Sequence, residues 1–471
     1  MSLDNLPVEW LSVQLKDIGN IYTGKTPSSK DVANFNGDIP FIKPGDLDEG
    51  GYICKTATHI STQALAALPN LPMNSIMVTC IGNMGKVGIT TEVSATNQQI
   101  NSIVPFKEFI SYKYIYYYCL TLKNWLDKES SATTIAIVNK GRFSEAPIPL
   151  PPLAEQQEIV RQLDVMLAQV EQIKARLDAI PAILKKFRQS VLADAVSGKL
   201  TEEWRGSVDY TSDESGLEIP NGWELKQIQD IADVKGGKRL PKGEELISEN
   251  TGYPYIRAGQ LKNGTIIATE EARSTQMYLR PEVQKLIKNY IICKDDAYIT
   301  IVGASIGDAG ITPEYFDGAN LTENAAKLTN YKMPLIPQFL GFWLRSYYLQ
   351  HLIKLETKSA AQGKLALTRI KTLPFLNPSI EEQNIIVGKV NYFLNLADRL
   401  EQTVQSAQKR VNLLTQSILA KAFSGELTAE WREQHQELIT GVNSAEALLA
   451  KIQSEREASK PVKNTCKKKE V

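Results

Sequence analysis

The sequence predicts an α+β protein with two mixed α/β domains in tandem, separated by two long helices that pair as an antiparallel coiled coil with pseudo-twofold symmetry. Three observations lead to this fold class: an internal duplication, short apolar segments between turn residues in each copy, and a heptad pattern after each copy. The chain has 471 residues, which is too long for one ordinary domain and suits two to four.

The duplication is visible as five matching segments that occur in the same order in both halves. Residues 6–18 match 219–231, 39–47 match 253–261, 85–90 match 307–312, 147–156 match 374–383, and 192–205 match 419–432. Chance is a poor explanation for this order. Because each repeat unit is long, we expect two copies of a domain followed by a helix rather than a solenoid of short modules.

Each copy begins with a region of alternating apolar runs and turn residues. Residues 39–42 and 75–81 are apolar and are bounded by Gly, Pro, Asn or Asp, as strands are. Residues 112–126 and 337–355 are apolar at helical spacing. Both regions are therefore predicted to be mixed α/β domains with short strands.

The helix after each domain has apolar residues at alternating spacings of three and four, which predicts a coiled-coil seam. The predicted seam residues are Ile159, Leu163, Met166, Val170, Ile173, Leu177, Leu184 and Phe187 in the first helix and Ile386, Val390, Phe393, Leu400, Val404, Val411 and Leu414 in the second. Both helices follow prolines and stop at Gly198 or Gly425, and Pro181 predicts a bend. The alternative is two separate surface helices, each packed on its own domain.

These patterns divide the chain into five segments. We expect a first domain at residues 1–150, a central helix at 151–207, a second domain at 208–376, a second long helix at 377–426, and a short amphipathic helix with a lysine-rich tail at 427–471. The tail is expected to be solvated or to touch nucleic acid.

Composition excludes several classes of protein. No run of about 18 apolar residues occurs, so no membrane span is expected. The first residues lack a signal-peptide pattern, which predicts a cytoplasmic protein. The five cysteines are scattered without a C-x-x-C pair and the three histidines are far apart, which argues against a disulfide framework, a zinc site or any other metal site.

Three motifs resemble catalytic or nucleotide-binding sequences, but each fits a structural role better. Residues 19–26 match the phosphate-loop pattern, yet Pro27 follows where a helix should begin. The glycine-rich segments 82–88 and 303–310 suit strand–turn–strand elements. Residues 377–380 resemble an amino-methyltransferase motif but lack its second proline and its aromatic residue. No catalytic residue is predicted.

Basic and amide side chains beside turns are the candidates for contacts with a nucleic acid, because these groups bind phosphates and base edges. The candidates are Lys25, Lys43, Lys140 and Arg142 in the first domain and Lys238, Arg257, Lys358, Gln362, Lys364 and Arg369 in the second. The alternative for each is a solvated surface charge.

Taken together, these features resemble the specificity subunit of type I restriction–modification systems over nearly the whole chain. Residues 148–156 and 417–428 are similar to the start and the end of that family's two constant helical regions. The Trp204-Arg205 and Trp431-Arg432 endings resemble its IA branch.

The resemblance implies a non-catalytic subunit with two target-recognition domains. These would read the two halves of an asymmetric bipartite site in double-stranded DNA. The helices would hold the domains apart and dock two methyltransferase subunits, and two restriction–translocase subunits would complete the complex. The resemblance implies no cofactor in this chain, and it assigns S-adenosylmethionine, ATP and Mg²⁺ to the partners.

The charge balance is unusual for a DNA-binding chain. The formal net charge is zero, residues 1–150 carry 12 basic and 13 acidic side chains, and residues 208–376 carry 20 of each. We therefore expect the partners to supply much of the contact with phosphates. Two rival interpretations are a coiled-coil scaffold without a DNA role and a self-contained methyltransferase.

Overall fold

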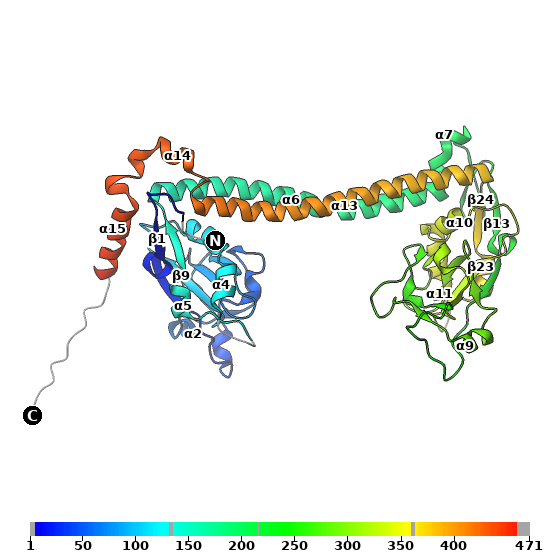
Figure 1. Ribbon diagram of the computed structural model, residues 1–471, viewed down its shortest axis with the longest axis horizontal. Coiled ribbons are helices and arrows are strands. Elements are labelled where there is room, and N and C mark those ends of the chain that lie inside the picture. The colour runs from blue at the N-terminus through cyan, green and yellow to red at the C-terminus, as the bar shows by residue number, and fades with distance from the viewer. Residues whose placement is uncertain (1–4, 131–134, 215, 359–362, 459–471) are drawn as a thin grey trace, which may run out of the picture. The chain divides into compact units, whose positions relative to one another are not determined.

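The structure is a computed structural model that describes residues 5–130, 135–214, 216–358 and 363–458 (Figure 1). The chain forms two compact units, one made of Met1–Asp178 with Ser406–Val471 and the other of Ala179–Gln405. Each unit therefore joins one α/β domain to parts of both long helices. The α+β fold class with two tandem domains is confirmed.

The domain of the first unit is built on a five-stranded sheet with the order β2-β9-β6-β7-β4, and a three-stranded sheet has the order β5-β3-β8. Its strands are β1 (Leu11–Gln14), β2 (Gly19–Thr23), β3 (Ile39–Ile42), β4 (Gly51–Ile53), β5 (His59–Ile60), β6 (Ile76–Thr79), β7 (Val87–Thr90), β8 (Ala95–Thr96), β9 (Ile100–Pro105) and β10 (Pro147–Leu150). Its helices are α1 (Leu15–Ile18), α2 (Thr62–Ala66), α3 (Tyr112–Cys119), α4 (Lys123–Glu129) and α5 (Lys140–Ser144). Strands β1 and β10 pair antiparallel and bring the two ends of the domain together.

The second unit repeats this plan with a four-stranded sheet of order β14-β23-β20-β21 and another of order β18-β15-β22-β19. Its strands are β11 (Tyr210–Ser212), β12 (Glu218–Pro220), β13 (Glu224–Gln227), β14 (Asp233–Gly236), β15 (Pro254–Ile256), β16 (Leu261–Lys262), β17 (Thr265–Ile266), β18 (Met277–Tyr278), β19 (Ile291–Ile292), β20 (Ala297–Thr300), β21 (Ala309–Ile311), β22 (Ala319–Leu321), β23 (Ala325–Thr329) and β24 (Pro374–Asn377). Its helices are α8 (Ile228–Ile231), α9 (Pro281–Leu286), α10 (Pro337–Leu344), α11 (Tyr347–Lys358) and α12 (Leu367–Thr372). The β13–β24 pair corresponds to β1–β10.

Two of the helical segments expected from the sequence are each divided in the structure. Residues 112–126 form α3 and α4, and residues 337–355 form α10 and most of α11. Ser346 lies at the second break, where its hydroxyl accepts a hydrogen bond from the Leu349 N–H at 3.2 Å. A side chain that caps a new helix in this way competes with continuation of the preceding one.

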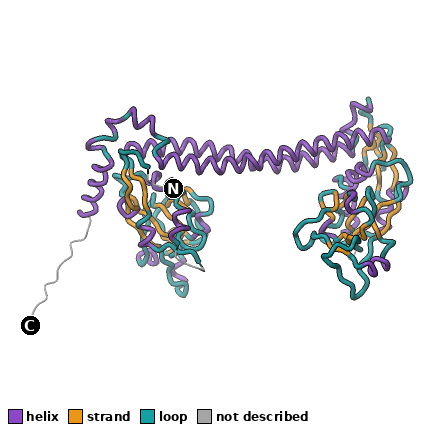
Figure 2. Tube along the Cα trace, in the orientation of Figure 1, coloured by secondary structure: helices purple, strands orange, loops and turns teal. Residues whose placement is uncertain are grey.

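The long helices are α6 (Leu153–Val196) and α13 (Ile380–Ser424), shown in purple in Figure 2. They run antiparallel within each unit. In the first unit the Gln408 amide donates to Asp178 at 2.6 Å, and in the second Arg188 pairs with both Asp398 and Glu401 at 2.7 Å. These contacts exclude the alternative of two unpaired surface helices. Helix α6 continues through Pro181 without a break.

Each long helix ends at a glycine with positive φ, as the sequence predicts. Gly198 has φ +77° and Gly425 has φ +82°. A Cβ atom at Gly198 would lie 2.5 Å from Pro220 Cγ, and one at Gly425 would lie 2.3 Å from Pro7 Cγ. Both conformation and space therefore require glycine at these helix ends.

A buried carboxylate at the start of each long helix binds the residues that follow the end of the other. Glu155 accepts hydrogen bonds from Thr428 at 2.7 Å, Arg432 at 3.0 Å and the Trp10 indole at 2.8 Å. Glu382 accepts hydrogen bonds from Thr201 and Arg205, both at 2.7 Å. We call these two clusters the end clamps. The residues that carried the family resemblance therefore join the two copies.

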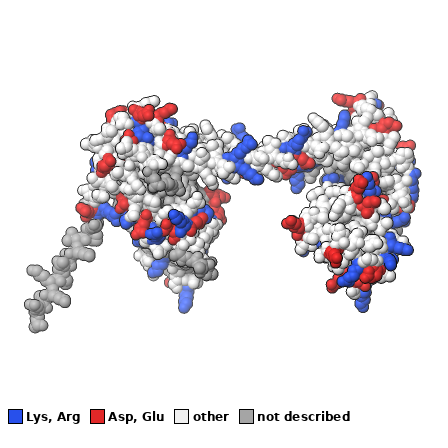
Figure 3. All heavy atoms as spheres, viewed as in Figure 1, with Lys and Arg blue, Asp and Glu red and all other residues white. Residues whose placement is uncertain are grey.

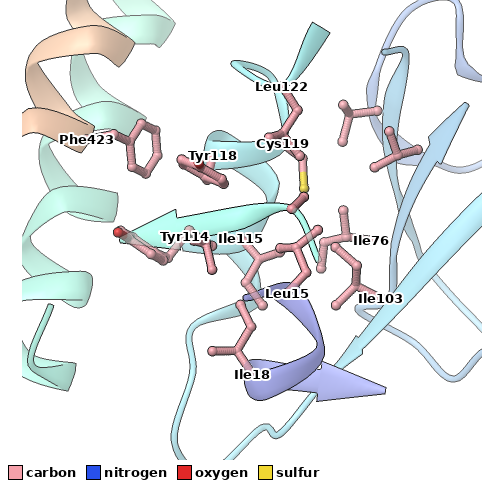
Figure 4. Packing of buried hydrophobic residues seen from close by; sticks show 14 of the residues in the cluster. Leu15, Ile18, Ile76, Ile103, Tyr114, Ile115, Tyr118, Cys119, Leu122 and Phe423 are labelled. Atoms are coloured by element: carbon pink, nitrogen blue, oxygen red, sulfur yellow. The ribbon is translucent and has the colours of Figure 1, made fainter. Parts of the chain in front are cut away.

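The core of the first unit includes side chains from both the domain and a long helix. Figure 4 shows Phe423 of α13 against Tyr114 and Tyr118 of α3, with ring centroids 5.4 Å and 5.1 Å apart. All three side chains are buried. Each buried aromatic side chain contributes a large apolar area, so this contact fixes the domain to the helix.

After α13 the described part of the chain forms two further α-helices. Helix α7 (Glu202–Arg205) corresponds to α14 (Ala429–Gln434), which leads to α15 (Ala445–Ala458). Leu448 and Ile452 of α15 are buried in the core of the first unit. The lysine-rich tail lies outside the described residues. Among the described residues, no helix combines the length and apolarity that crossing a membrane requires.

Candidate nucleic-acid interface

Two basic candidates of the first domain flank one tight turn between β8 and β9. In this turn the Asn97 carbonyl accepts a hydrogen bond from the Ile100 N–H at 3.2 Å, and Gln98 and Gln99 lie at the tip. On one side the Lys25 N–H donates to the Thr96 carbonyl at 2.9 Å. On the other, the Asn97 N–H donates to the Ile42 carbonyl at 3.1 Å, one residue before Lys43. The structure thus brings Lys25 and Lys43 to one polar loop.

The second domain has the same arrangement between β22 and β23. The Thr322 carbonyl accepts from the Ala325 N–H at 3.2 Å, which places Glu323 and Asn324 at the tip. The Lys238 N–H donates to the Leu321 carbonyl at 2.9 Å, and the Thr322 N–H donates to the Ile256 carbonyl at 3.1 Å. Lys238 and Arg257 therefore flank this turn as Lys25 and Lys43 flank the first. We call residues 96–99 and 321–324 the tip turns.

A glycine before each lysine allows the close approach of the tip turn. A Cβ atom at Gly24 would lie 2.1 Å from the Asn97 carbonyl oxygen, and one at Gly237 would lie 2.0 Å from the Thr322 carbonyl oxygen. No other residue fits these positions unless the backbone moves. The two matching Gly-Lys pairs of the sequence therefore have one structural cause.

The side chains of the flanking cations have different surroundings. Lys43 donates to the Thr58 hydroxyl at 2.9 Å, and the Arg257 guanidinium donates to the Thr275 carbonyl while its Nε is buried without a partner. Lys238 lies 5.4 Å from the centre of the Tyr290 ring. Lys25 and Lys238 are exposed, so their ammonium groups are available to an anion.

The remaining candidates lie on or beside the short helices before each long helix. Lys140 begins α5, and its Nζ lies 5.9 Å from the centre of the Tyr22 ring. The backbone of Lys364 pairs with that of Val302 in an isolated antiparallel β-bridge. Arg142 pairs with Glu129, and Arg369 pairs with Glu356 at 3.3 Å. Hydrogen bonding to Glu129 raises the pKa of the Arg142 guanidinium. The two arginines each have a carboxylate partner, whereas Lys25 and Lys238 form no ion pair with the described residues.

The described residues do not include the side chains of two predicted residues of the second domain. Lys358 is the last residue of α11, and Gln362 lies outside the described residues.

Sequence reasoning missed the side chains of the tip turns and their partners. Thr26 donates to the Gln98 side-chain carbonyl at 2.6 Å, and Arg239 donates to the Glu323 carboxylate at 2.7 Å. Partial burial opposes ionisation of Glu323, but hydrogen bonds, including that from Arg239, outweigh it and lower its pKa. The run Asn97-Gln98-Gln99 before a strand was the one signal in the sequence that could have indicated this site.

The two glycine motifs are structural, as the sequence analysis favoured. Residues 19–23 form strand β2 rather than a phosphate loop, and no helix follows in residues 24–28. Gly85 and Gly307 have positive φ in the turns that join β6 to β7 and β20 to β21.

The predicted seam residues differ in exposure. Among them Ile159, Leu163, Val170, Leu184, Ile386, Val390 and Val404 are buried, Met166, Leu177, Phe187, Phe393 and Val411 are half-buried, and Ile173, Leu400 and Leu414 are exposed. Phe187 and Phe393 meet with ring centroids 6.1 Å apart. The helices therefore keep apolar side chains that the described residues leave exposed.

The visible face of each domain in Figure 3 carries both basic and acidic side chains. On the visible face in Figure 3, blue and red atoms are interspersed on both domains. This pattern agrees with the equal numbers of basic and acidic residues in the chain.

The family model and the similar proteins all belong to type I restriction systems. The family described as Type I restriction modification DNA specificity domain matches residues 7–182 and 220–408. The Type I restriction enzyme EcoBI specificity subunit of Escherichia coli is 33% identical over 465 residues, covering 98% of this chain and 95% of that protein. The EcoDI specificity subunit of Escherichia coli is 29% identical, covering 99% of this chain and 100% of its own.

Solved structures share the fold. The crystal structure of the HsdS subunit from Thermoanaerobacter tengcongensis has a TM-score of 0.58 at 16% identity and covers 89% of this chain and 98% of its own. A chain from a study of complex assembly and conformational transition of the type I R-M system has a TM-score of 0.64 at 15% identity, covering 89% of this chain and 99% of its own.

Proposed function

The chain belongs to the family of type I restriction–modification DNA specificity subunits, and from this premise we propose that each of its domains reads one half of an asymmetric bipartite DNA site. The chain is a DNA-specificity subunit and is not itself an enzyme. We take residues 1–150 and 208–376 as the two recognition domains and residues 151–207 and 377–426 as the constant helices. The IA-like branch is part of this proposal and rests on the Trp-Arg endings at 204–205 and 431–432.

The observation that carries the proposal is the pair of tip turns. The backbone around them is held in the same way in both units, but their exposed side chains differ. Two copies of one scaffold with different reading residues suit a DNA site whose halves differ. A scaffold without a DNA role has no use for this combination.

The helices are proposed to set the spacing of the half-sites and to dock two methyltransferase subunits. Exposed apolar side chains support the docking. Those on α6 and α13 are Val165, Ile173, Ile183, Tyr392, Leu400, Leu413 and Leu414. Exposed apolar side chains that form a large patch mark sites of contact with other proteins.

The other partners and cofactors follow from the family role. Two restriction–translocase subunits would complete the complex in the cytoplasm. S-adenosylmethionine, ATP and Mg²⁺ would be used by the partner subunits rather than by this chain. Methylation of adenine would then occur at sites that this chain selects.

An exchange of residues 1–150 for those of a relative tests the proposal. Host DNA is sequenced for methylated adenines before and after the exchange. One half of the methylated sequence should change while the other half and the spacer remain. An unchanged sequence in both halves would contradict the reading role of the domain. Exchange of residues 208–376 is the reciprocal control and should change only the other half.

A further inference from the structure

We infer that the side-chain pairs at the tip turns, Thr26 with Gln98 and Arg239 with Glu323, are the base-reading groups of the two domains. This inference rests on the proposed function, because it assigns residues to the reading of each half-site. It concerns side chains for which sequence analysis gave no role. It also predicts which kind of base each domain distinguishes.

The two pairs occupy equivalent positions, as their backbone shows. Thr26 and Arg239 each follow a Gly-Lys pair whose lysine N–H binds the tip turn. Gln98 and Glu323 are each the first tip residue. In each turn the side chain before the first tip residue accepts a backbone hydrogen bond. The Asn97 side chain accepts from the Gln99 N–H at 3.2 Å, and the Thr322 hydroxyl accepts from the Asn324 N–H at 3.4 Å. The two domains thus present a donor and an acceptor from the same two backbone positions.

The fold does not depend on these side chains. Thr26 and Gln98 are exposed, and the Arg239 side chain is 79% exposed. The Arg239–Glu323 ion pair lies at the surface, with Glu323 half-buried, and a surface ion pair of this kind contributes little to stability. The backbone hydrogen bonds and the Gly24 and Gly237 contacts hold the turns, so the outward side chains are free to differ between the copies.

The chemistry of the pairs matches base edges. Arginine binds the O6 and N7 atoms of guanine, glutamate accepts from the amino group of cytosine, and glutamine binds adenine. Arg239 and Glu323 therefore fit a G·C pair, and Gln98 with Thr26 fits an A·T pair. Each pair is joined by one hydrogen bond at 2.6 Å or 2.7 Å, which holds the side chains in place before DNA arrives.

The neighbouring cations supply the complementary contact. Lys25 and Lys43 flank the Gln98 turn, and Lys238 and Arg257 flank the Glu323 turn. The exposed ammonium groups of Lys25 and Lys43 beside the first turn, and of Lys238 beside the second, suit contacts with the phosphates that border a groove. Phosphate contacts would fix the register, and the tip side chains would read the base pair.

The test transplants one pair into the other domain. Arg239→Thr is combined with Glu323→Gln, which replaces the pair of the second domain by the Thr–Gln pair of the first. The matched control is Lys294→Thr with Glu314→Gln, which removes another exposed ion pair of the same unit, with a distance of 3.0 Å. Each variant is assembled with its methyltransferase, and competition by duplexes with single base-pair changes measures discrimination at every position of the wild-type site.

The transplanted variant should lose roughly tenfold to a hundredfold discrimination at a G·C position of one half-site. The other half should keep its full discrimination, and the control variant should match the wild type throughout. Arg239→Lys gives a second arm, because it keeps the charge but loses the two-pronged geometry that binds guanine. It should lose the same G·C discrimination together with roughly tenfold to a hundredfold of the affinity for the wild-type site, while the salt dependence of binding remains because the charge is kept.

Two results would overturn the inference. One is wild-type discrimination at every position in both Arg239 variants, and the other is an equal loss in both half-sites. Domain exchange separates this failure from that of the proposed function. If exchange of residues 208–376 changes a half-site but the Arg239 variants do not, the domain reads DNA through other residues.

Discussion

Replacing Glu155 with Gln should destabilise the first unit more than replacing Glu382 with Gln destabilises the second. Glu155 is fully buried and its partner Arg432 is 11% exposed, so water does not screen their interaction strongly. Removal of one partner from a buried ion pair costs about 3–5 kcal/mol, because the other charge stays buried without compensation. The glutamine keeps the size of the side chain, so the loss reflects charge and hydrogen bonding rather than a cavity.

The two end clamps differ by one hydrogen bond, which sets the difference between the variants. The Trp10 indole donates to Glu155, whereas the Trp223 indole nitrogen in the second unit is buried without a partner. A hydrogen bond to a charged group contributes about 1.5–3 kcal/mol. Glu155→Gln should therefore cost up to about 3 kcal/mol more than Glu382→Gln.

Thermal unfolding with hydrogen exchange read out by mass spectrometry measures both effects, because peptides from each unit report separately. For units of this size, 1 kcal/mol corresponds to about 2–4 °C in Tm. Glu155→Gln should lower the transition of the first unit by roughly 6–20 °C and leave the second unit unchanged. The double variant Glu155→Met with Arg432→Met should cost less than the two single variants combined. Equal, small shifts in Tm for Glu155→Gln and Glu382→Gln would refute the reasoning. So would a loss of stability in the Glu155→Met, Arg432→Met double variant equal to the sum of the losses in its two single variants.

Three further predictions concern DNA and partner binding. Gly24→Ala should distort the first tip turn, because the added Cβ would lie 2.1 Å from the Asn97 carbonyl oxygen. Sequencing of methylated adenines in host DNA should then show relaxed specificity in one half-site. Gly45→Ala, whose Cβ would have no neighbour within 4 Å, is the control. Lys25→Ala should reduce the slope of log affinity against log salt by about 1, whereas Arg142→Ala should not, since Glu129 already holds Arg142; equal slopes for the two variants would count against phosphate binding by Lys25. The isolated chain should bind its site weakly and gain affinity when the methyltransferase is added. Leu413→Asp should weaken binding of the methyltransferase at least about tenfold, because Leu413 is 64% exposed here and its burial against the partner would be lost. Asn412→Asp, at a neighbouring exposed position, is the control, and an equal loss in both variants would show that Leu413 is not in the interface.

Features encoded by local pattern were predictable from the sequence. The heptads of α6 and α13 and the glycine at each helix end need only neighbouring residues to be recognised, because helical spacing and left-handed backbone are local properties. Lys25 and Lys238 were found because the Gly-Lys pairs match. The division of residues 112–126 into two helices was missed, because apolar spacing continues across the break between α3 and α4.

The reading pairs could not be predicted for a different reason. Thr26 and Gln98 are separated by 72 residues, and Arg239 and Glu323 by 84. Their partnership depends on how two loops meet in the folded domain. The tip turns also share little sequence, since Thr96-Asn97-Gln98 corresponds to Leu321-Thr322-Glu323. Comparison of the two copies finds residues that match, and it therefore misses positions at which the copies differ because they read different bases.

The end clamps explain why the two copies remain alike where they do. Glu155 of the first copy is held by Thr428 and Arg432 of the second, and Glu382 of the second by Thr201 and Arg205 of the first. A change in either helix end therefore leaves a buried carboxylate of the other copy without its donors, at a cost of several kcal/mol. The tip side chains Gln98 and Glu323 carry no such penalty, because each contacts only its own domain at the surface. Stability thus constrains the helix ends to one solution while the reading residues remain free to change with the DNA site.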